Sequence, residues 1–253
     1  MVPCVEHGMD TAPDVGKQEP GAWPVLPEMF TLVCFVIFIP PHVTSIHLTH
    51  DPNVRFWMGD ALSFIALVLS PALIIAGHIP YRLRGAPTKW VLILSLIGPS
   101  LVFGVLANHM LTKAMDLGNE FAAGDCARPT PKFYLQESWL AAQDFYDGCQ
   151  VQDDVNPNAY LIHNCVGYYD KYTNNSYWQY LSQMEIGYRC GGWCEPNATL
   201  WTYTKANDSC STAISQVMSG KIVSTALQIV VYSMCVLTLT ATTLILLGPS
   251  LRW

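Results

Sequence analysis

Residues 222–247 read IVSTALQIVVYSMCVLTLTATTLILL, an uncharged and mostly apolar stretch. A helix that crosses a bilayer needs about 20 such residues in a row. Three further blocks meet this requirement, at 29–48, 61–79 and 91–111. Prolines lie within these three blocks, and we expect kinks there rather than helix ends, because neighbouring helices can satisfy the freed carbonyl groups. The sequence therefore predicts an all-α membrane protein with a bundle of four transmembrane helices.

The segments around the four blocks give the predicted organisation and orientation. The regions are a cytosolic tail at 1–28, three helices with short connections at 29–111, a large loop at 112–221, and the fourth helix with a short cytosolic end at 222–253. The connection between the second and third blocks holds Arg82, Arg84 and Lys89 and no acidic residue. Basic residues in short loops favour the cytosolic side. The large loop is therefore expected to be extracellular or lumenal, and no cleaved signal peptide is expected.

Composition and motifs argue against several functional classes. The charged fraction is 13%, the hydrophobic fraction is 51% and the net charge is −6. This acidic balance argues against a nucleic-acid partner, which normally requires a basic face. We find no catalytic Ser/His/Asp order and no phosphate-binding loop in the sequence. The four apolar blocks also lack the Asp, Glu, Lys or Arg that an ion path needs. We therefore expect neither an enzyme nor a transporter.

Six of the nine cysteines lie in the large loop: Cys126, Cys149, Cys165, Cys190, Cys194 and Cys210. An even set in one loop predicts up to three disulfides and an oxidising compartment. Six cysteines allow fifteen pairings, and the sequence does not choose among them. Cys4, Cys34 and Cys235 lie outside the loop and are expected to be free or acylated.

N-glycosylation sequons give an independent indication of where the large loop lies. They begin at Asn174 (Asn-Asn-Ser), Asn197 (Asn-Ala-Thr) and Asn207 (Asn-Asp-Ser), all within the loop. Glycosylation acceptors belong to surface loops of secreted or lumenal segments. The sequons therefore agree with the orientation that the basic connection predicts.

Aromatic residues are dense in the same loop. Tyrosine and tryptophan are favoured at protein interfaces because they bury area at low entropic cost and keep a polar tip. We therefore expect a partner-binding surface that includes Tyr168, Tyr169, Tyr177, Trp178, Trp193 and Trp201. The alternative is that several of these side chains fill the core of the loop or lie at the membrane surface. An amphipathic helix is expected at 132–146, ending at Gly148.

The layout and the loop motifs together resemble the tetraspanin family. Trp139 and Gln143 lead to Gly148-Cys149, and Cys190-Gly-Gly-Trp-Cys-Glu-Pro is followed by Trp201 and Cys210. The resemblance in layout covers almost the whole chain, whereas the motifs are confined to the loop. The family's adjacent Cys-Cys-Gly triplet and the acidic residue of its later spans are absent. The resemblance implies a non-enzymatic scaffold that organises partner membrane proteins through the large loop.

Histidines suggest the main chemical alternative. His42, His47 and His50 are expected at the outer end of the first span and His109 at the outer end of the third. Matched histidines on neighbouring helices can bind haem or a metal, which would make the chain a membrane oxidoreductase. The spacing of Cys190 and Cys194 is not that of thiol oxidoreductases. We predict no catalytic residue, metal site or cofactor.

The sequence thus predicts a multi-pass membrane scaffold whose partners are integral membrane proteins and the bilayer, with homo-oligomers left open. The membrane is the plasma membrane, an endomembrane or a ciliary membrane. An accessory structural subunit of one large membrane complex is the first alternative. The two readings overlap, because a tetraspanin-like protein can itself be such a subunit.

Overall fold

The computed structural model describes residues 26–84, 88–152 and 161–247, and within these residues the chain is helical and holds no β-strand. Cys4 lies outside the described residues. The first span is α1 (Pro27–Thr49) and the second is α3 (Asp60–Arg84). The third joins α4 (Lys89–Leu92), the π-helix η1 (Ile93–Ile97) and α5 (Gly98–Ala122). The fourth joins α9 (Cys210–Gln216), the π-helix η3 (Val217–Ile222) and α10 (Val223–Leu247). All four are long and apolar enough to cross a membrane, which confirms the predicted all-α fold with four such helices.

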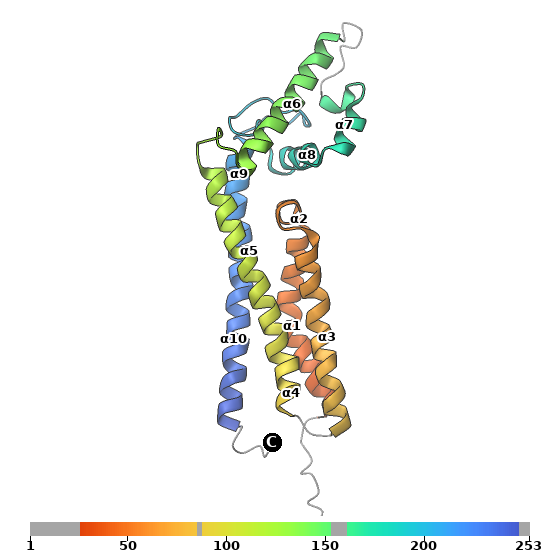
Figure 1. Ribbon diagram of the computed structural model, residues 1–253, viewed down its shortest axis with the longest axis vertical. Helices are drawn as coiled ribbons and strands as arrows, with labels where there is room; N and C mark the ends of the chain where they lie inside the picture. Colours follow the sequence, from red (N-terminus) through yellow and green to blue (C-terminus); the bar gives the residue numbers. More distant parts are fainter. Residues whose placement is uncertain (1–25, 85–87, 153–160, 248–253) are drawn as a thin grey trace, which may run out of the picture.

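Small residues let these helices pack closely. α1 packs on α3, α3 on α5, and α5 on α10 (Figure 1). A Cβ on Gly77 of α3 would lie only 2.1 Å from the Ser95 hydroxyl oxygen of η1. In the upper bundle the Ser215 hydroxyl donates to the Gly118 carbonyl over 2.8 Å. Small side chains at such contacts are the usual means by which transmembrane helices approach one another.

The third and fourth helical stretches are longer than a bilayer requires. They cover Lys89–Ala122 and Cys210–Leu246, 34 and 37 residues. At a rise of about 1.5 Å per residue each exceeds 50 Å, whereas the hydrocarbon core is about 30 Å thick. Both helices therefore extend beyond the bilayer core and carry, at one end, residues 123–152 and 161–209, which we call the head (Figure 1).

The head, in its described residues, consists of four helical elements and their connecting loops. These are α6 (Pro131–Gln152), the 3-10 turn η2 (Ile162–Asn164), α7 (Tyr168–Asn174) and α8 (Ser176–Tyr188). Beneath it lies α2 (Pro52–Met58), which joins α1 to α3 and contacts α8 (Figure 1). α6 does not end at Gly148 as expected but continues to Gln152. A glycine inside a helix costs only about 1 kcal/mol relative to alanine, and buried Leu135, Trp139 and Ala142 hold the helix in place.

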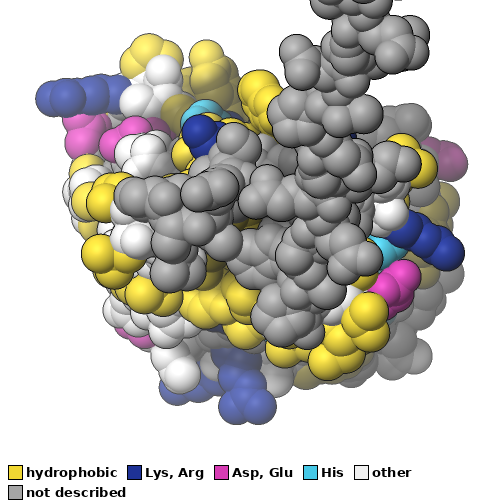
Figure 2. Space-filling model, turned by 90° about the horizontal axis from the view of Figure 1, so that it is seen from below, with side chains coloured by type: hydrophobic (Ala, Val, Ile, Leu, Met, Phe, Trp, Pro, Cys, Tyr) yellow, Lys and Arg dark blue, Asp and Glu magenta, His cyan; other side chains and the backbone are white. Residues whose placement is uncertain are grey.

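The opposite end of the bundle holds the basic connection. Arg82, Arg84 and Lys89 are exposed there, at the ends of α3 and α4 farthest from the head (Figure 1). Viewed from that end, much of the described surface is hydrophobic, and charged side chains stand at its margin (Figure 2). The head and the basic connection thus lie at opposite ends of the molecule.

Candidate functional site: the disulfide-braced head

Three disulfides fasten the head. The structure pairs Cys126 with Cys194, Cys149 with Cys165, and Cys190 with Cys210. The first joins the loop after α5 to the loop after α8, the second ties the end of α6 to the turn before α7, and the third attaches the end of α8 to the start of α9. Each disulfide thus fixes a connection that has little core of its own. This pairing is one of the fifteen that the sequence left open.

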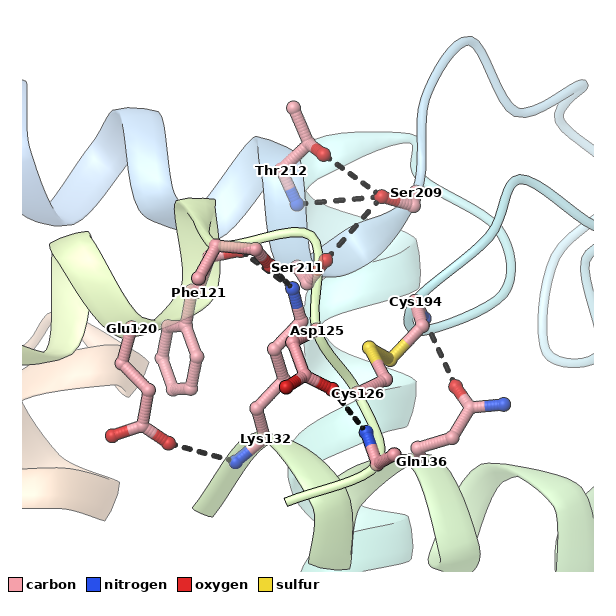
Figure 3. Close-up of a disulfide and its surroundings, with 12 residues drawn as sticks. Glu120, Phe121, Asp125, Cys126, Lys132, Gln136, Cys194, Ser209, Ser211 and Thr212 are labelled. Carbon is pink, nitrogen blue, oxygen red and sulfur yellow. Dashed lines mark hydrogen bonds between the residues drawn. A yellow bond between two sulfur atoms is a disulfide. The ribbon is translucent and has the colours of Figure 1, made fainter. Parts of the chain in front are cut away.

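A buried lysine closes the junction between α5 and α6. The Lys132 side chain is only 3% exposed, and its ammonium group donates to the carbonyl oxygens of Phe121 and Ala123 at the end of α5 (Figure 3). The Lys132 backbone N–H donates to Glu120 over 3.1 Å. Burial lowers the pKa of the Lys132 ammonium, while Glu120 and Asp125 act in the opposite direction. A cation here satisfies helix-end carbonyls that would otherwise lack donors.

A second conspicuous interaction joins α6 to the Cys194 turn. The Gln136 side-chain oxygen accepts from the Cys194 backbone N–H over 2.9 Å, next to the Cys126–Cys194 disulfide (Figure 3). The turn itself depends on glycine. Gly192 has a φ of +70°, and a Cβ there would lie 2.0 Å from the Glu195 carbonyl oxygen. The Cys190-Gly-Gly-Trp-Cys motif therefore forms a tight turn that only glycine permits.

The six aromatic residues expected at a partner surface divide into two groups. Tyr168, Trp178, Trp193 and Trp201 are 0–5% exposed and form the core of the head. Two of the indole N–H groups form hydrogen bonds within the head: that of Trp201 donates to the Tyr168 hydroxyl, and that of Trp178 donates to the Ser138 carbonyl. This corrects the expectation for these four, because a small domain needs its largest side chains for its own core. Tyr169 and Tyr177 remain exposed, at 68% and 36%.

Glu185 fastens α8 to the loop after the Cys194 turn. It is 1% exposed, and its carboxylate accepts from the backbone N–H groups of Leu200, Trp201 and Thr202. Burial raises the pKa of Glu185 to about 7, although the three N–H donors act to lower it. A lone Glu in an aromatic-rich segment gave no signal of this role in the sequence.

The sequon asparagines lie on the surface of the head. Asn174, Asn197 and Asn207 are all exposed, so each could carry a glycan without disturbing the core. Asn174 ends α7, and the other two lie in the loops between α8 and α9. Ser209, the hydroxyl residue of the third sequon, is buried and caps α9 by accepting from the Thr212 N–H.

A polar junction connects the head to α2, and sequence reasoning missed it. Asn53 is fully buried, donates to the Tyr188 hydroxyl over 2.9 Å and accepts from the Tyr180 hydroxyl over 2.8 Å. The Trp57 indole also donates to Tyr180. Asp51, 5% exposed, caps α2 and pairs with Lys221 of η3 over 2.9 Å. The only available signal was the Asp-Pro-Asn triplet, which is typical of a capped helix start.

An open pocket of about 350 Å³ lies between the end of α8 and the start of the fourth span. Its lining includes the charged residues Arg189, Asp208 and Lys221. Arg189 follows α8 with φ 53° and ψ 42°, the left-handed conformation that glycine usually supplies at this position. Among the described non-glycine residues it is the one with positive φ. The left-handed conformation costs a residue with a side chain roughly 1–2 kcal/mol.

Two of the membrane histidines contact carbonyl oxygens one turn earlier in the first span. His42 Nδ1 lies 2.6 Å from the Phe38 carbonyl oxygen and His50 Nδ1 lies 2.8 Å from that of Ile46, each within its own helix. Within residues 26–84, 88–152 and 161–247 no group of three His, Cys, Asp or Glu side chains could hold a metal ion. Cys34 is buried within the bundle, while Cys235 is exposed on α10.

Comparisons with known proteins identify no relative of this chain. No protein-family model, no curated protein and no solved structure matches the chain. Its assignment therefore depends on its own features: four helices long and apolar enough to cross a membrane, and three disulfides. These features indicate an integral membrane protein.

Proposed function

We propose that this chain is a non-enzymatic, tetraspanin-like scaffold that binds partner membrane proteins through its head. The observation that carries the proposal is the set of three disulfides, which lie within the head or join it to the first residue of α9, with none elsewhere in the described residues. Disulfides persist in oxidising compartments. An extracellular or lumenal head fits this requirement, in the plasma membrane, an endomembrane or a ciliary membrane.

Two further observations support that orientation. The exposed basic residues Arg82, Arg84 and Lys89 lie at the end of the bundle away from the head, as the positive-inside tendency requires (Figure 1). The three exposed sequon asparagines lie on the head. A glycoprotein with a cytosolic basic connection accounts for both.

We assign partner binding to the edge of the head formed by Val166 and Tyr169. Val166 is 93% exposed and Tyr169 is 68% exposed, on either side of Gly167 and directly after the Cys149–Cys165 disulfide. An apolar and an aromatic side chain held in water by a cross-linked turn lose little conformational freedom when a partner covers them. Exposed Tyr177 of α8 is a second contact of the same kind.

Co-purification tests this binding surface. The full chain and the V166D/Y169A double variant are extracted in mild detergent after cross-linking in native membranes, and partners are identified by mass spectrometry. We expect the wild type to retain several membrane proteins and the double variant to lose most of them. The Tyr203→Ala variant is a matched control, since Tyr203 is 73% exposed elsewhere on the head. Equal recovery by both variants would contradict the assignment, and one fixed set of partners in constant ratio would identify an accessory subunit instead.

Orientation has its own test. Sealed vesicles are treated with protease from the cytosolic side, and the protein is then treated with peptide N-glycosidase. We expect the head to be protected from protease and to lose mass on deglycosylation. A head that is unglycosylated and digested from the cytosolic side would overturn the scaffold proposal as stated.

A further inference from the structure

We propose that the pocket beside Arg189 binds the headgroup of a phospholipid that carries a primary ammonium group, as phosphatidylethanolamine does. This inference uses the four membrane-spanning helices and is independent of partner binding by the head. Its basis is the depth of the pocket, the charges in and beside its lining, and the backbone conformation of Arg189.

The pocket lies at the depth of lipid headgroups. Lys221 lines it and directly precedes residues 222–247, which hold no charged residue. α10 itself has 25 residues, about 37 Å at the usual rise, which is enough to cross the hydrocarbon core. Lys221 therefore marks the boundary between hydrocarbon and headgroups, and the pocket opens just above that boundary.

Charges around the pocket are balanced. The Lys221 ammonium group lies 2.9 Å from the buried Asp51 carboxylate, yet the Lys221 side chain is 66% exposed and keeps donors free. Arg189 and Asp208 are exposed, and in the described part of the chain neither side chain has a hydrogen-bond or ion-pair partner. The lining holds the cations Arg189 and Lys221 and the carboxylate of Asp208. The Asp51 carboxylate, which pairs with Lys221 outside the lining, brings the sum of these four charges to zero. Such a site complements a zwitterion, with phosphate toward Arg189 and Lys221 and ammonium toward Asp208, better than an anionic headgroup.

The remaining lining residues favour a primary ammonium over choline. Trimethylammonium groups are recognised by cages of several aromatic rings. Tyr188 is the one aromatic residue on the wall of this pocket. Asn207 and Gln216 also line the pocket, and their side-chain amide oxygens, together with the Asp208 carboxylate, are groups that can accept from the three N–H donors of an ethanolamine. The volume of about 350 Å³ lies within the usual range of small-molecule sites.

The backbone of Arg189 indicates that its side chain is used. Two backbone hydrogen bonds fix its position: the Asn207 N–H donates to the Arg189 carbonyl, and the Gly191 N–H donates to the Asp208 carbonyl. These bonds hold Arg189 and Asp208 on facing segments at the pocket. An arginine in a left-handed position that suits glycine is unfavourable for the fold alone, and strained residues of this kind gather at binding sites.

Lipid retention by the purified full chain tests the proposal. The protein in detergent is titrated with phosphatidylethanolamine, phosphatidylcholine and phosphatidylglycerol of the same short acyl length, and bound lipid is counted by native mass spectrometry. We expect phosphatidylethanolamine to be retained at least tenfold more tightly than the other two. Equal retention of all three would overturn the proposal.

The Arg189→Gly variant separates binding from folding. It removes the guanidinium group and relieves the left-handed backbone, so we expect unchanged or higher thermal stability together with at least a tenfold loss of phosphatidylethanolamine affinity. Lys205→Gln is the matched control, because Lys205 is an exposed cation on the head that does not line the pocket. Full binding by Arg189→Gly, or equal losses in both variants, would contradict the proposal.

One further variant identifies the group that faces the ammonium. Asp208→Asn should weaken the binding of phosphatidylethanolamine and strengthen that of phosphatidylglycerol relative to it, because the carboxylate that faces the ammonium group is gone. Unchanged relative affinities for the two lipids would contradict this placement of the ammonium group.

Discussion

Glu185 gives the head a dependence on pH. Burial raises the pKa of Glu185 in the folded head to about 7, above its ordinary value of 4.5. Between these two pH values the Glu185 side chain is protonated in the folded head and ionised in the unfolded chain. The stability that this group contributes therefore increases as pH falls from about 7 toward 4.5, and it is lost as pH rises back through about 7.

We expect the thermal midpoint of the head, followed by tryptophan fluorescence, to rise as pH is lowered through this window. Glu185→Gln should remove that slope. It should also lower stability by about 1–3 kcal/mol, because an amide cannot accept from all three N–H groups. Glu195→Gln, at an exposed position, is the control and should keep the slope. A slope that survives in Glu185→Gln would assign the pH dependence to another group.

Two glycines of the head predict opposite responses to alanine. A Cβ on Gly192 would meet the Glu195 carbonyl oxygen at 2.0 Å in a backbone with positive φ, whereas one on Gly187 of α8 meets nothing within 4 Å. Gly192→Ala should therefore prevent the Cys190–Cys210 and Cys126–Cys194 disulfides from forming efficiently. Gly187→Ala should stabilise α8 by up to about 1 kcal/mol. Mobility on non-reducing gels and thermal melts measure the two effects, and equal effects would contradict this account of the turn.

At the scale of elements, Lys132 joins α5 to α6. Lys132→Met keeps the apolar stem but leaves the Phe121 and Ala123 carbonyls without their donor, and hydrogen bonds to charged groups contribute about 1.5–3 kcal/mol. We expect a loss of that size and faster amide exchange at residues 119–123. Lys171→Met is the control, since the Lys171 ammonium group lies 4.5 Å from the Phe145 ring centroid at the surface and should cost under about 1 kcal/mol.

The disulfides differ in the length of chain that they close. Cys126–Cys194 closes 68 residues and Cys149–Cys165 closes 16. In the chain-entropy account the longer loop stabilises by about 4 kcal/mol and the shorter by about 3 kcal/mol. Replacing the Cys126 and Cys194 pair by serine should thus lower the denaturation midpoint more than replacing the Cys149 and Cys165 pair. The native protein should shift on a gel after reduction, and the absence of a shift would contradict the disulfides themselves.

At the scale of the whole molecule, the Asp51–Lys221 pair attaches the first connection to the fourth span beneath the head. Its two members are not equivalent, because the Asp51 side chain is 2% exposed and that of Lys221 is 66% exposed. Lys221→Met leaves the buried Asp51 carboxylate without its cation. Asp51→Asn keeps an acceptor for the α2 cap and leaves the Lys221 ammonium group solvated. We expect Lys221→Met to lower stability more. Thermal melts combined with amide exchange in α2 and α8 would detect this, and the reverse order would show that the carboxylate is solvated.

The sequence alone determined the four helices, the basic connection at one end and the presence of cross-links, because hydrophobic length, charge and cysteine count are local properties of the chain. Tertiary structure decided the pairing of the cysteines, since that depends on which loops meet in space. It also decided which aromatic residues are buried: Trp193 packs against Phe121 of α5, far away in the chain, and against Tyr180 of α8. The junction at Asn53 arises from hydrogen bonds to residues more than a hundred positions away in the chain. The pocket at Arg189 includes a strained backbone position. Neither feature leaves a periodic pattern in the sequence.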